Sequence, residues 1–385
     1  MRESTVRDHI TKKDKSVRLT SFLHHLNFLN QLFEISLNFF FYLIRVLLKE
    51  KEDKRKTLVI ICLHRLGDTV FCISAITEIF NNFKDYKKYI FTFKETGDIL
   101  NLKFDDENII KIDRSEIKFQ GRLASKKAHE IINQLNPSYI VDFTGTPASA
   151  SLIFNKTAAK IVGMNLPYFK KIYTDFILKR TEPHFIDNYL DVARLIIPNL
   201  PSASNYEFNT DINRNSKIMI HPFAIRKAKE WNFRKFIELA LRLNDNYQVE
   251  IIFPKNFISE DVYKELKDMD LHFRITGSIK DLICAIQQAG VFISNDSGPT
   301  YVAALLGKPT FTIYGPTNPK YSLPFGKFHE YHQNKMLCSA YNEMFCFTLG
   351  GIECPSVECM NSISLDTIEA KVLKFIEGLR INKKR

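Results

Sequence analysis

The chain has 385 residues, which exceeds a typical single domain and predicts two domains of roughly 150 to 200 residues each. Hydrophobic residues make up 45% and charged residues 25%, so the composition predicts a globular protein with a sizeable core and excludes wholesale disorder. The formal net charge of +11 favours anionic partners, a class that includes phosphorylated substrates, acidic lipids and nucleic acid.

The cysteine content and the first residues bear on location. The chain has 7 cysteines, too few for the dense framework of a small secreted domain, so we expect a reducing cytoplasm. The polar start fits no secretory signal. The most apolar stretch, residues 35–48, is interrupted by Asn38 and Arg45 and is shorter than the roughly 20 residues that a bilayer span needs.

Residues 1–55 are predicted to form a basic arm with an amphipathic helix, because apolar side chains recur there every three or four residues. The apolar positions are Leu19, Phe22, Leu23, Leu26, Phe33, Leu37, Phe40, Phe41, Ile44 and Leu48. Glu34, Asn38 and Arg45 belong to the opposite, polar face, and lysines and arginines flank the helix on both sides. Two interpretations stay open: the apolar stripe packs on the protein's own body, or the helix lies in an anionic membrane interface.

Two α/β halves follow, residues 56–205 and residues 216–385, because short β-rich apolar runs alternate with helical stretches. The expected strands are 58–63, 89–93, 109–112, 139–143, 217–220, 249–253, 272–276, 291–294 and 310–314. The expected helices are 70–83, 123–135, 233–243, 260–269, 280–288, 299–306 and 365–379. This alternation predicts parallel sheets with right-handed crossovers, ligands at the carboxyl ends of the strands, and a cleft between the halves.

The first strand runs into the loop Arg65-Leu66-Gly67-Asp68 and then into a helix. Gly67 permits close backbone approach, and the carboxylate of Asp68 at this edge of the sheet could act as a general base. Capping of the following helix by Asp68 is the alternative, structural interpretation.

In the second half, the first strand ends at His221-Pro222, and the cations Arg226, Lys227 and Lys229 precede the next helix. Cations in this position could hold a diphosphate, although a solvated basic loop also fits. Trp231 is expected to be a packing residue.

The segment from Val291 to Pro319 carries two more loops at the same edge. In the first, Asp296-Ser297-Gly298-Pro299 opens a helix, whose free N–H groups and dipole favour an anion. Asp296 would repel phosphate, so we expect it to brace the loop or to contact a sugar hydroxyl. The second loop contains Gly315 and Thr317. A ligand-free αβ turn explains any single piece, but not all of them together.

These three segments, in this order and spacing, resemble glycosyltransferase family 9, the ADP-heptose:lipopolysaccharide heptosyltransferase family, over about residues 58–379. The resemblance implies an α/β fold of GT-B type, in which two Rossmann-like doubly wound parallel-sheet domains face a cleft. It also implies an acceptor site mainly in the first domain and a nucleotide-sugar site in the second. The implied reaction is an inverting, metal-independent glycosyl transfer without a cofactor, in which a nucleotide-diphosphate sugar such as ADP-heptose is a co-substrate.

On this resemblance Asp68 matches the catalytic base, and Arg65 and Gly67 belong to the acceptor-side loop. The residues that match the donor site are Lys229, Asp296, Ser297, Gly298, Pro299, Tyr301, Gly315 and Thr317. The chain departs from the family at Tyr301, where members often have a histidine, and at Pro254-Lys255-Asn256, where many carry an acidic residue. The donor sugar or base therefore need not be that of ADP-heptose.

Four cysteines near the C-terminus, Cys338, Cys346, Cys354 and Cys359, also resemble a cysteine-bearing tail of the family. Their spacing is not a paired Cys-x-x-Cys ladder, so reduced thiols packed in a loop are favoured over a structural metal or a disulfide. The other three, Cys62, Cys72 and Cys284, lie in apolar surroundings and are expected in the core.

The resulting hypothesis is a cytoplasmic, membrane-peripheral glycosyltransferase that adds a sugar to a lipopolysaccharide core or another surface glycan. The arm would hold it against the anionic inner leaflet, where a lipid-linked acceptor lies. The alternative is a nucleotide-sugar-binding protein of the same fold without transferase activity. Nucleic-acid binding is not expected, because no basic and aromatic platform recurs in the α/β body.

Overall fold

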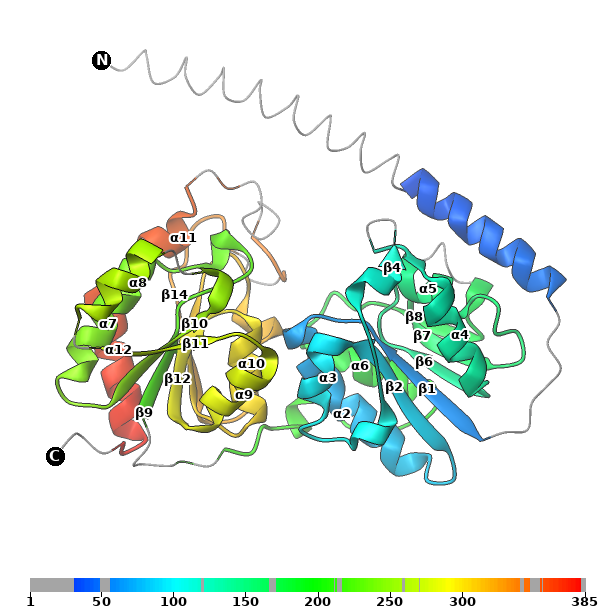
Figure 1. Cartoon of the computed structure of the whole chain (residues 1–385), viewed down its shortest axis with the longest axis horizontal. Helices are drawn as coiled ribbons and strands as arrows, with labels where there is room; N and C mark the ends of the chain where they lie inside the picture. Colours follow the sequence, from blue (N-terminus) through cyan, green and yellow to red (C-terminus); the bar gives the residue numbers. More distant parts are fainter. Residues whose placement is uncertain are drawn as a thin grey trace, which may run out of the picture.

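The computed structural model describes residues 31–48, 56–118, 121–165, 171–210, 212, 217–257, 260–269, 271–339, 343–346, 354 and 356–381. Within these residues, two six-stranded sheets lie side by side, and helices pack on their faces (Figure 1). All pairings within both sheets are parallel, as the alternation of strands and helices in the sequence predicts.

The first sheet has the strand order β3-β2-β1-β6-β7-β8. Its central strand β1 is buried at every position, because helices cover both faces of a parallel sheet. The strands are β1 (Thr57–Cys62), β2 (Lys87–Phe93), β3 (Ile109–Ile112), β6 (Tyr139–Asp142), β7 (Lys160–Asn165) and β8 (Asp175–Leu178). Strands β7 and β8 were not predicted from the sequence.

The second sheet repeats this order as β11-β10-β9-β12-β13-β14. Its strands are β9 (Lys217–His221), β10 (Val249–Pro254), β11 (His272–Thr276), β12 (Ala289–Asn295), β13 (Thr310–Tyr314) and β14 (His329–Gln333). Strand β14 was not predicted, because its sequence, HEYHQ, has no apolar run.

Both strand orders reverse at the middle of the sheet, between β1 and β6 and between β9 and β12. Ligands of doubly wound sheets bind outside the carboxyl ends of the strands at this switch point. At these two points the chain leaves β1 toward Asp68 and leaves β12 toward Asp296. The fold therefore places both predicted loops where a ligand is expected.

Helices occur at the seven positions predicted from the sequence, with shifts at their ends, and α3, α5, α6 and α11 in the following list were not predicted. They are α2 (Leu66–Asn82), α3 (Lys94–Leu100), α4 (Lys126–Leu135), α5 (Pro147–Ile153), α6 (Phe185–Arg194), α7 (Phe233–Asn244), α8 (Glu260–Lys267), α9 (Ile279–Gln287), α10 (Gly298–Leu305), α11 (Glu358–Asn361) and α12 (Leu365–Gly378). The predicted helix 123–135 begins only at Lys126, because the Ser125 hydroxyl caps it by accepting from the Ala128 N–H. The two residues before Ser125 form strand β5 (Leu123–Ala124), which pairs with β4 (Ile117–Lys118).

One hydrophobic core continues from the first domain into the second through α2, α6, α9 and α10. At its centre the rings of Phe71 and Tyr301 lie 4.7 Å apart between centroids. At its edge the Tyr321 hydroxyl donates to the Thr181 carbonyl at 2.6 Å. The two domains are thus packed against each other beneath the predicted cleft.

The arm is helical over residues 31–47 and lies against the first domain (Figure 1). Phe41 is 3% exposed and stacks on Phe154, with ring centroids 4.7 Å apart. Arg45 Nη1 donates to the carbonyls of Phe154 and Lys156 at 3.3 and 3.0 Å. One side of the helix therefore packs on the protein body.

The outer side of this helix does not follow the predicted pattern. Arg45 and Glu34, which we assigned to the polar outer face, contact the body, the latter through Arg122. Phe39, Phe40 and several other apolar side chains are exposed instead. The predicted apolar positions before residue 31 lie outside the described residues, and no described helix is long and apolar enough to cross a membrane.

Cys62 and Cys72 are fully buried, as expected, whereas the prediction that Cys284 lies in the core is wrong. On α9 the buried face carries Leu282, Ile283 and Ile286. Cys284 falls on the opposite side and is exposed.

The loop after β6, at the carboxyl edge of the first sheet, leaves no room for a side chain at Gly145. Gly145 has φ of +59°, and a Cβ there would lie 2.2 Å from the Met164 carbonyl oxygen, which belongs to a backbone that cannot move cheaply. Gly121 has φ of +83° but open space around it. We expect Gly121→Ala to cost only the backbone term of about 1 to 2 kcal/mol, and Gly145→Ala to cost at least about 3 kcal/mol.

Thermal unfolding of both variants measures this difference. Equal losses of stability would contradict the close approach at Gly145.

Candidate functional site

The amino ends of α2 and α10, which belong to different domains, meet directly. A Cβ on Gly67 would lie 3.0 Å from a ring carbon of Tyr301, and a Cβ on Gly298 would lie 2.8 Å from the Leu66 Cβ. Only residues without a side chain allow this approach. The structure thereby brings together the acceptor-side loop and the donor-side loop, which lie more than two hundred residues apart in the chain.

Asp68 is the third residue of α2 and is partly exposed, while Arg65, itself exposed, occupies the capping position. Asp68 therefore does not cap the helix. No hydrogen bond joins its carboxylate to another described residue. The dipole of α2 stabilises a negative charge in this first turn, so Asp68 is a charged acceptor that is available to a ligand.

His64 is the neighbouring titratable group. Burial lowers the pKa of its imidazole, and the negative charge of Asp68 opposes that shift. Its Nε2–H donates to the Phe143 carbonyl at 3.1 Å. The ring is therefore neutral near pH 7 and forms no ion pair with Asp68.

His64 also belongs to a group with Cys62 and Cys72 whose potential metal-ligand atoms lie within 4.8 Å of one another. Both sulfurs are fully buried among apolar side chains of the core. This environment is that of packing residues, as the sequence suggests.

Asp296 is the centre of the donor-side loop. Its side chain is buried, and its carboxylate accepts from Lys229 Nζ, the Tyr301 hydroxyl and the Thr317 hydroxyl, each at 2.5 Å. Burial would raise its pKa, but the Lys229 ammonium and these hydrogen bonds lower it below the usual value. Asp296 braces the loop, which was one of its two predicted roles.

Lys229 lies in a 3-10 turn and is 19% exposed at its side chain, so its ammonium stands at the border of the site. Lys227 of the same turn differs, because its side chain is 84% exposed and pairs with Glu230. Of these two predicted cations, Lys229 belongs to the site, whereas Lys227 is solvated.

Asn295 is a site residue that the sequence analysis did not single out. Its Nδ2 donates to the Pro222 carbonyl at 2.7 Å, and its Oδ1 accepts from the Trp231 N–H at 2.9 Å. Trp231 itself is fully buried, as expected of a packing residue. Asn295 thus ties the cationic turn to the end of β12. An amide that closes an apolar strand was the signal in the sequence.

Ser297 and Gly298 form the start of α10. Ser297 holds the capping position without a capping hydrogen bond, and its buried Oγ has no hydrogen-bond partner among the described residues. The first N–H groups of a helix have no intrahelical acceptor, and buried Pro299 supplies no N–H. The serine hydroxyl and the N–H groups therefore offer donors to an anion at the positive end of the helix dipole.

The second donor-side loop follows β13. Thr317 reaches Asp296, while Gln333 Nε2 on β14 donates to the carbonyls of Gly315 and Thr317 at 2.7 and 2.8 Å. A Cβ on Gly315 would lie 2.4 Å from the Met360 Sδ, so this glycine makes room for the C-terminal tail. Gly315 thus supports the loop through its packing against Met360. Gln333 was not predicted as a site residue, because its strand β14 was not predicted.

The Lys229–Asp296 pair gives a test of this geometry. Lys229→Met leaves Asp296 buried without its cation, so we expect a loss of about 3 kcal/mol in unfolding free energy. Asp296→Asn in the same chain should restore part of it. Lys227→Met, the matched control, should cost less than about 1 kcal/mol. Chemical denaturation measures these differences, and equal losses for the two lysines would refute the pairing.

The same pair predicts a pH dependence. The folded-state pKa of Asp296 is lowered, so the stabilisation is present above the unfolded pKa and is lost as the pH falls through the folded pKa. The stability difference between wild type and Lys229→Met should be full at neutral pH and shrink below about pH 4.

Comparison with known proteins places this site in context. Residues 149–350 match the model of Glycosyltransferase family 9 (heptosyltransferase). The chain is 24% identical over 318 residues to lipooligosaccharide heptosyltransferase 2 of Campylobacter jejuni, which covers 79% of this chain and 93% of the relative.

Solved structures show the same fold. E. coli heptosyltransferase WaaC with ADP-2-deoxy-2-fluoro heptose has a TM-score of 0.60 at 14% identity, over 83% of this chain and 99% of that one. A family 9 glycosyl transferase of Veillonella parvula has a TM-score of 0.64 at 17% identity, over 86% and 99%. The predicted GT-B arrangement of two Rossmann-like domains is confirmed.

Proposed function

Because the chain belongs to glycosyltransferase family 9, we propose that this glycosyltransferase moves a heptose or similar sugar from a nucleotide-diphosphate sugar to a lipopolysaccharide core or other surface glycan. The name of the Campylobacter relative and the ADP-sugar analogue in the E. coli structure support this choice, and make ADP-heptose the first donor to test. The observation that carries the proposal is the meeting of the Asp68 helix with the Ser297–Gly298 helix.

The reaction would be a single displacement. Asp68 accepts the proton of the acceptor hydroxyl while its oxygen forms a bond to the anomeric carbon. The bond from that carbon to the diphosphate oxygen breaks on the opposite side, so the configuration inverts. Arg65, at the start of the same helix, and Gly67 belong to the surface that the acceptor would approach.

The leaving diphosphate would bind on the donor side. Its charge is met by the Ser297 hydroxyl, by the N–H groups of Ser297 and Gly298, and by the nearby Lys229 ammonium. These groups would supply the positive potential that other transferases obtain from a divalent cation. We therefore propose a transfer that needs no metal ion at the reacting atoms.

Tyr301 stands where the resemblance to family 9 leads us to expect a histidine. Burial and the charge of Asp296 raise its pKa, so its phenol stays protonated and donates to Asp296. Its polar atom is therefore engaged within the loop, and recognition of the donor sugar falls to other groups.

Asp68→Asn tests the proposed base. We expect kcat to fall by about 100- to 10,000-fold, because the amide cannot take the proton. Calorimetry should show unchanged binding of ADP. Asp85→Asn is the matched control, because that carboxylate is 80% exposed and, of the residues that the structure describes, pairs with Lys56 at the surface. Release of ADP from ADP-heptose, with a heptose-deficient lipooligosaccharide as acceptor, measures the rate.

Turnover of Asp68→Asn at the wild-type rate would exclude this base. If wild-type protein binds ADP-heptose but transfers nothing to any acceptor, the alternative of a binding protein without transferase activity is favoured.

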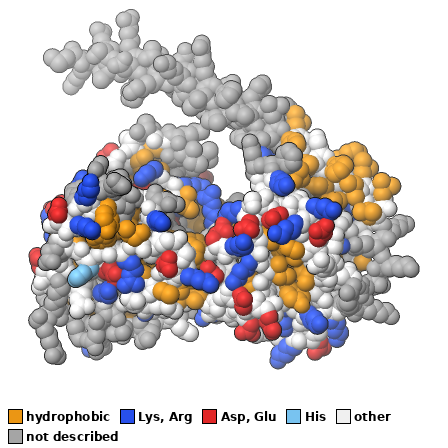
Figure 2. Space-filling model, viewed as in Figure 1, with side chains coloured by type: hydrophobic (Ala, Val, Ile, Leu, Met, Phe, Trp, Pro, Cys, Tyr) orange, Lys and Arg blue, Asp and Glu red, His pale blue; other side chains and the backbone are white. Residues whose placement is uncertain are grey.

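The arm helix supports a second part of the proposal, a peripheral contact with an anionic membrane on the cytoplasmic side. Apolar side chains cover its outer surface, and Figure 2 shows them as a continuous patch. The exposed members are Leu32, Phe33, Ile35, Phe39, Phe40, Leu43, Val46, Leu47 and Leu48. Lysines and arginines flank this helix in the sequence, which suits anionic headgroups.

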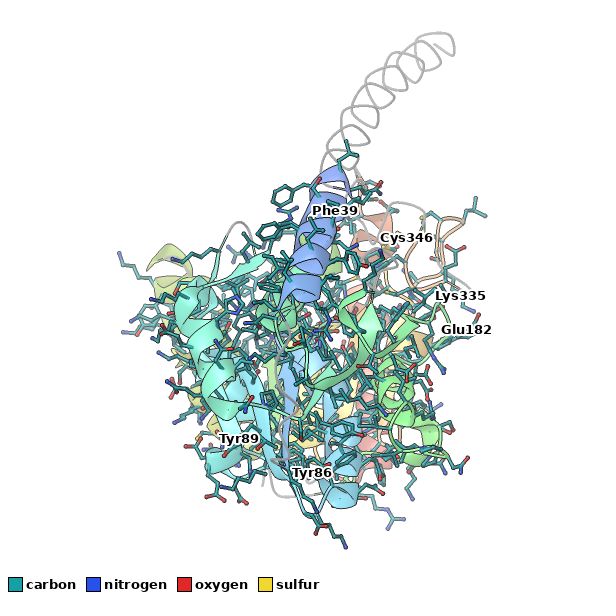
Figure 3. The ribbon with its side chains drawn as sticks, turned by 90° about the vertical axis from the view of Figure 1, so that its right-hand side faces the viewer. Phe39, Tyr86, Tyr89, Glu182, Lys335 and Cys346 are labelled. Carbon is teal, nitrogen blue, oxygen red and sulfur yellow. The ribbon has the colours of Figure 1, made fainter. Side chains whose placement is uncertain are left out.

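The position of this patch suits a lipid-linked acceptor. Phe39 on the arm helix and Cys346 beside the donor-side loop lie toward one end of the molecule (Figure 3). Tyr86 and Tyr89, at the amino end of β2, lie toward the other end (Figure 3). A membrane on the arm helix would therefore be on the side of the carboxyl ends of the strands, where the site is.

The double variant Phe39→Ser, Phe40→Ser tests this contact. Both rings are more than half exposed, so the fold should not depend on them. Binding to vesicles with anionic phosphatidylglycerol, measured by sedimentation, should fall by about tenfold or more. Phe257→Ser, at an exposed ring of the second domain, should bind as wild type does. Equal binding of all three proteins would refute the contact.

A further inference from the structure

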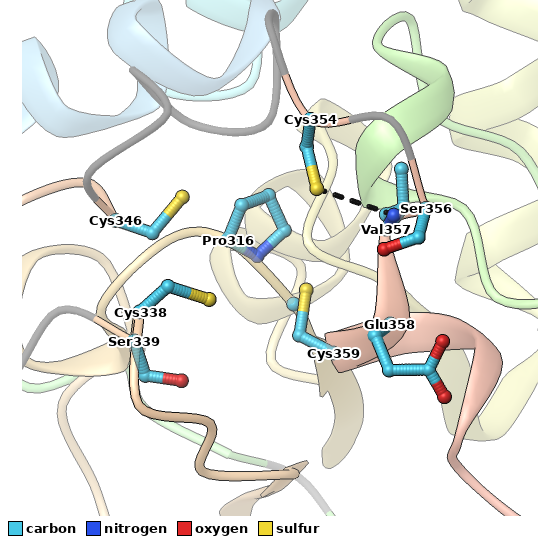
Figure 4. Close-up of a pocket in the computed structure, with 10 residues that line it drawn as sticks. Pro316, Cys338, Ser339, Cys346, Cys354, Ser356, Val357, Glu358 and Cys359 are labelled. Atoms are coloured by element: carbon cyan, nitrogen blue, oxygen red, sulfur yellow. Dashed lines mark hydrogen bonds between the residues drawn. The ribbon is translucent and has the colours of Figure 1, made fainter. Parts of the chain in front are cut away.

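The four cysteines of the C-terminal region, which all fall within residues 338–359, line one pocket. Cys338 follows β14, Cys346 is next to Phe345 and its bridge to Thr317, Cys354 precedes the turn at Val357, and Cys359 lies on α11. Their sulfur atoms point toward a common space beside Pro316 (Figure 4). The spacing in the sequence gave no sign of this convergence, because separate segments deliver the thiols.

The surroundings suit a soft cation better than a substrate. No lysine, arginine or histidine lines this pocket among the described residues, and Glu358 is its charged member. Cys346 and Cys359 are buried, Cys354 is half-buried and Cys338 is exposed, and none of them is in a disulfide. The four sulfur atoms are therefore gathered around a space that holds no cationic side chain of the described residues.

The sulfur of Cys354 already accepts a hydrogen bond from the backbone. The Val357 N–H donates to Cys354 Sγ at 3.2 Å, a contact of the kind that stabilises metal-bound thiolates. Val357 pays for this position with a left-handed backbone, φ +46° and ψ +43°, which is unfavourable for a β-branched residue. The turn then leads directly into α11 and Cys359.

We propose that Cys338, Cys346, Cys354 and Cys359 form a structural site for one thiophilic metal ion, with Zn²⁺ as the expected occupant. Four thiolates at a tetrahedral site are the ligand set that Zn²⁺ takes in structural centres. Metal–sulfur distances of about 2.3 Å require the cysteine side chains, which loops and a short helix carry, to turn inward. The sheets need not move.

The site would hold the second donor-side loop in place. The Cys346 N–H donates to the Pro316 carbonyl at 3.0 Å, and Thr317 forms a β-bridge with Phe345. On the other side Met360, next to Cys359, packs against Gly315. A metal ion would tie these two contacts together without touching the reacting atoms. The inference does not depend on which sugar is transferred.

The metal content of the full-length protein tests the proposal. The protein is purified under reducing conditions, without a histidine tag, from a zinc-supplemented culture and is analysed by plasma mass spectrometry. We expect about one zinc ion per chain. In the apoprotein, added Co²⁺ should give the strong visible bands of tetrahedral thiolate coordination.

Two serine variants separate this site from adventitious binding. The metal content of Cys354→Ser and of Cys359→Ser should be lower than that of the wild type by about tenfold or more. The control Cys284→Ser removes an exposed thiol elsewhere and should contain as much metal as the wild type. The wild-type measurement decides the question even if a variant fails to fold. Less than about a tenth of a metal ion per wild-type chain, or a disulfide among the four cysteines in protein alkylated at harvest, would overturn the proposal.

Discussion

The buried carboxylate of Asp296 is the constraint on which the site depends. A buried charge is costly unless cations and hydrogen-bond donors meet it, so three separate segments must converge on this one side chain. Lys229 brings the cationic turn, Thr317 brings the loop after β13, and Tyr301 brings the first turn of α10. The ring of Tyr301 in turn lies against Gly67, the residue before Asp68. The position of the Asp68 loop therefore depends on the same cluster that holds the donor-side loops.

The two sheets explain why these segments are within reach of one another. Each sheet reverses its strand order once, and the loops at that point diverge and leave space at the carboxyl edge. Because the domains share a continuous apolar core through α2 and α10, the two edges are held side by side. A proton acceptor on one edge and an anion site on the other are then available to a single reaction.

The parts outside the sheets adapt this arrangement to its setting. The arm helix packs on the first domain through Phe41 as well as through the polar groups of Arg45 and Glu34, and it leaves its other apolar side chains outside, where a surface helix usually carries polar ones. The C-terminal segment packs on the loop after β13 through Met360 and the β-bridge at Phe345. The arm helix thus suits an apolar environment, and the C-terminal segment supports the donor-side loop after β13.

The sequence by itself determined the fold class, most strands of both sheets and the loops that carry Asp68, Lys229 and Asp296. Apolar runs, glycines and charged residues at strand ends are local signals, and a single chain displays them. Only the tertiary structure decided that Asp296 holds Lys229, that Gly67 and Gly298 touch, that Cys284 is exposed, and that four scattered cysteines share a pocket. Those facts depend on which surfaces of distant segments meet, and side-chain packing between domains leaves no periodic trace in the sequence. For the same reason β14, whose place comes from pairing with β13 rather than from its own composition, was visible only in the structure.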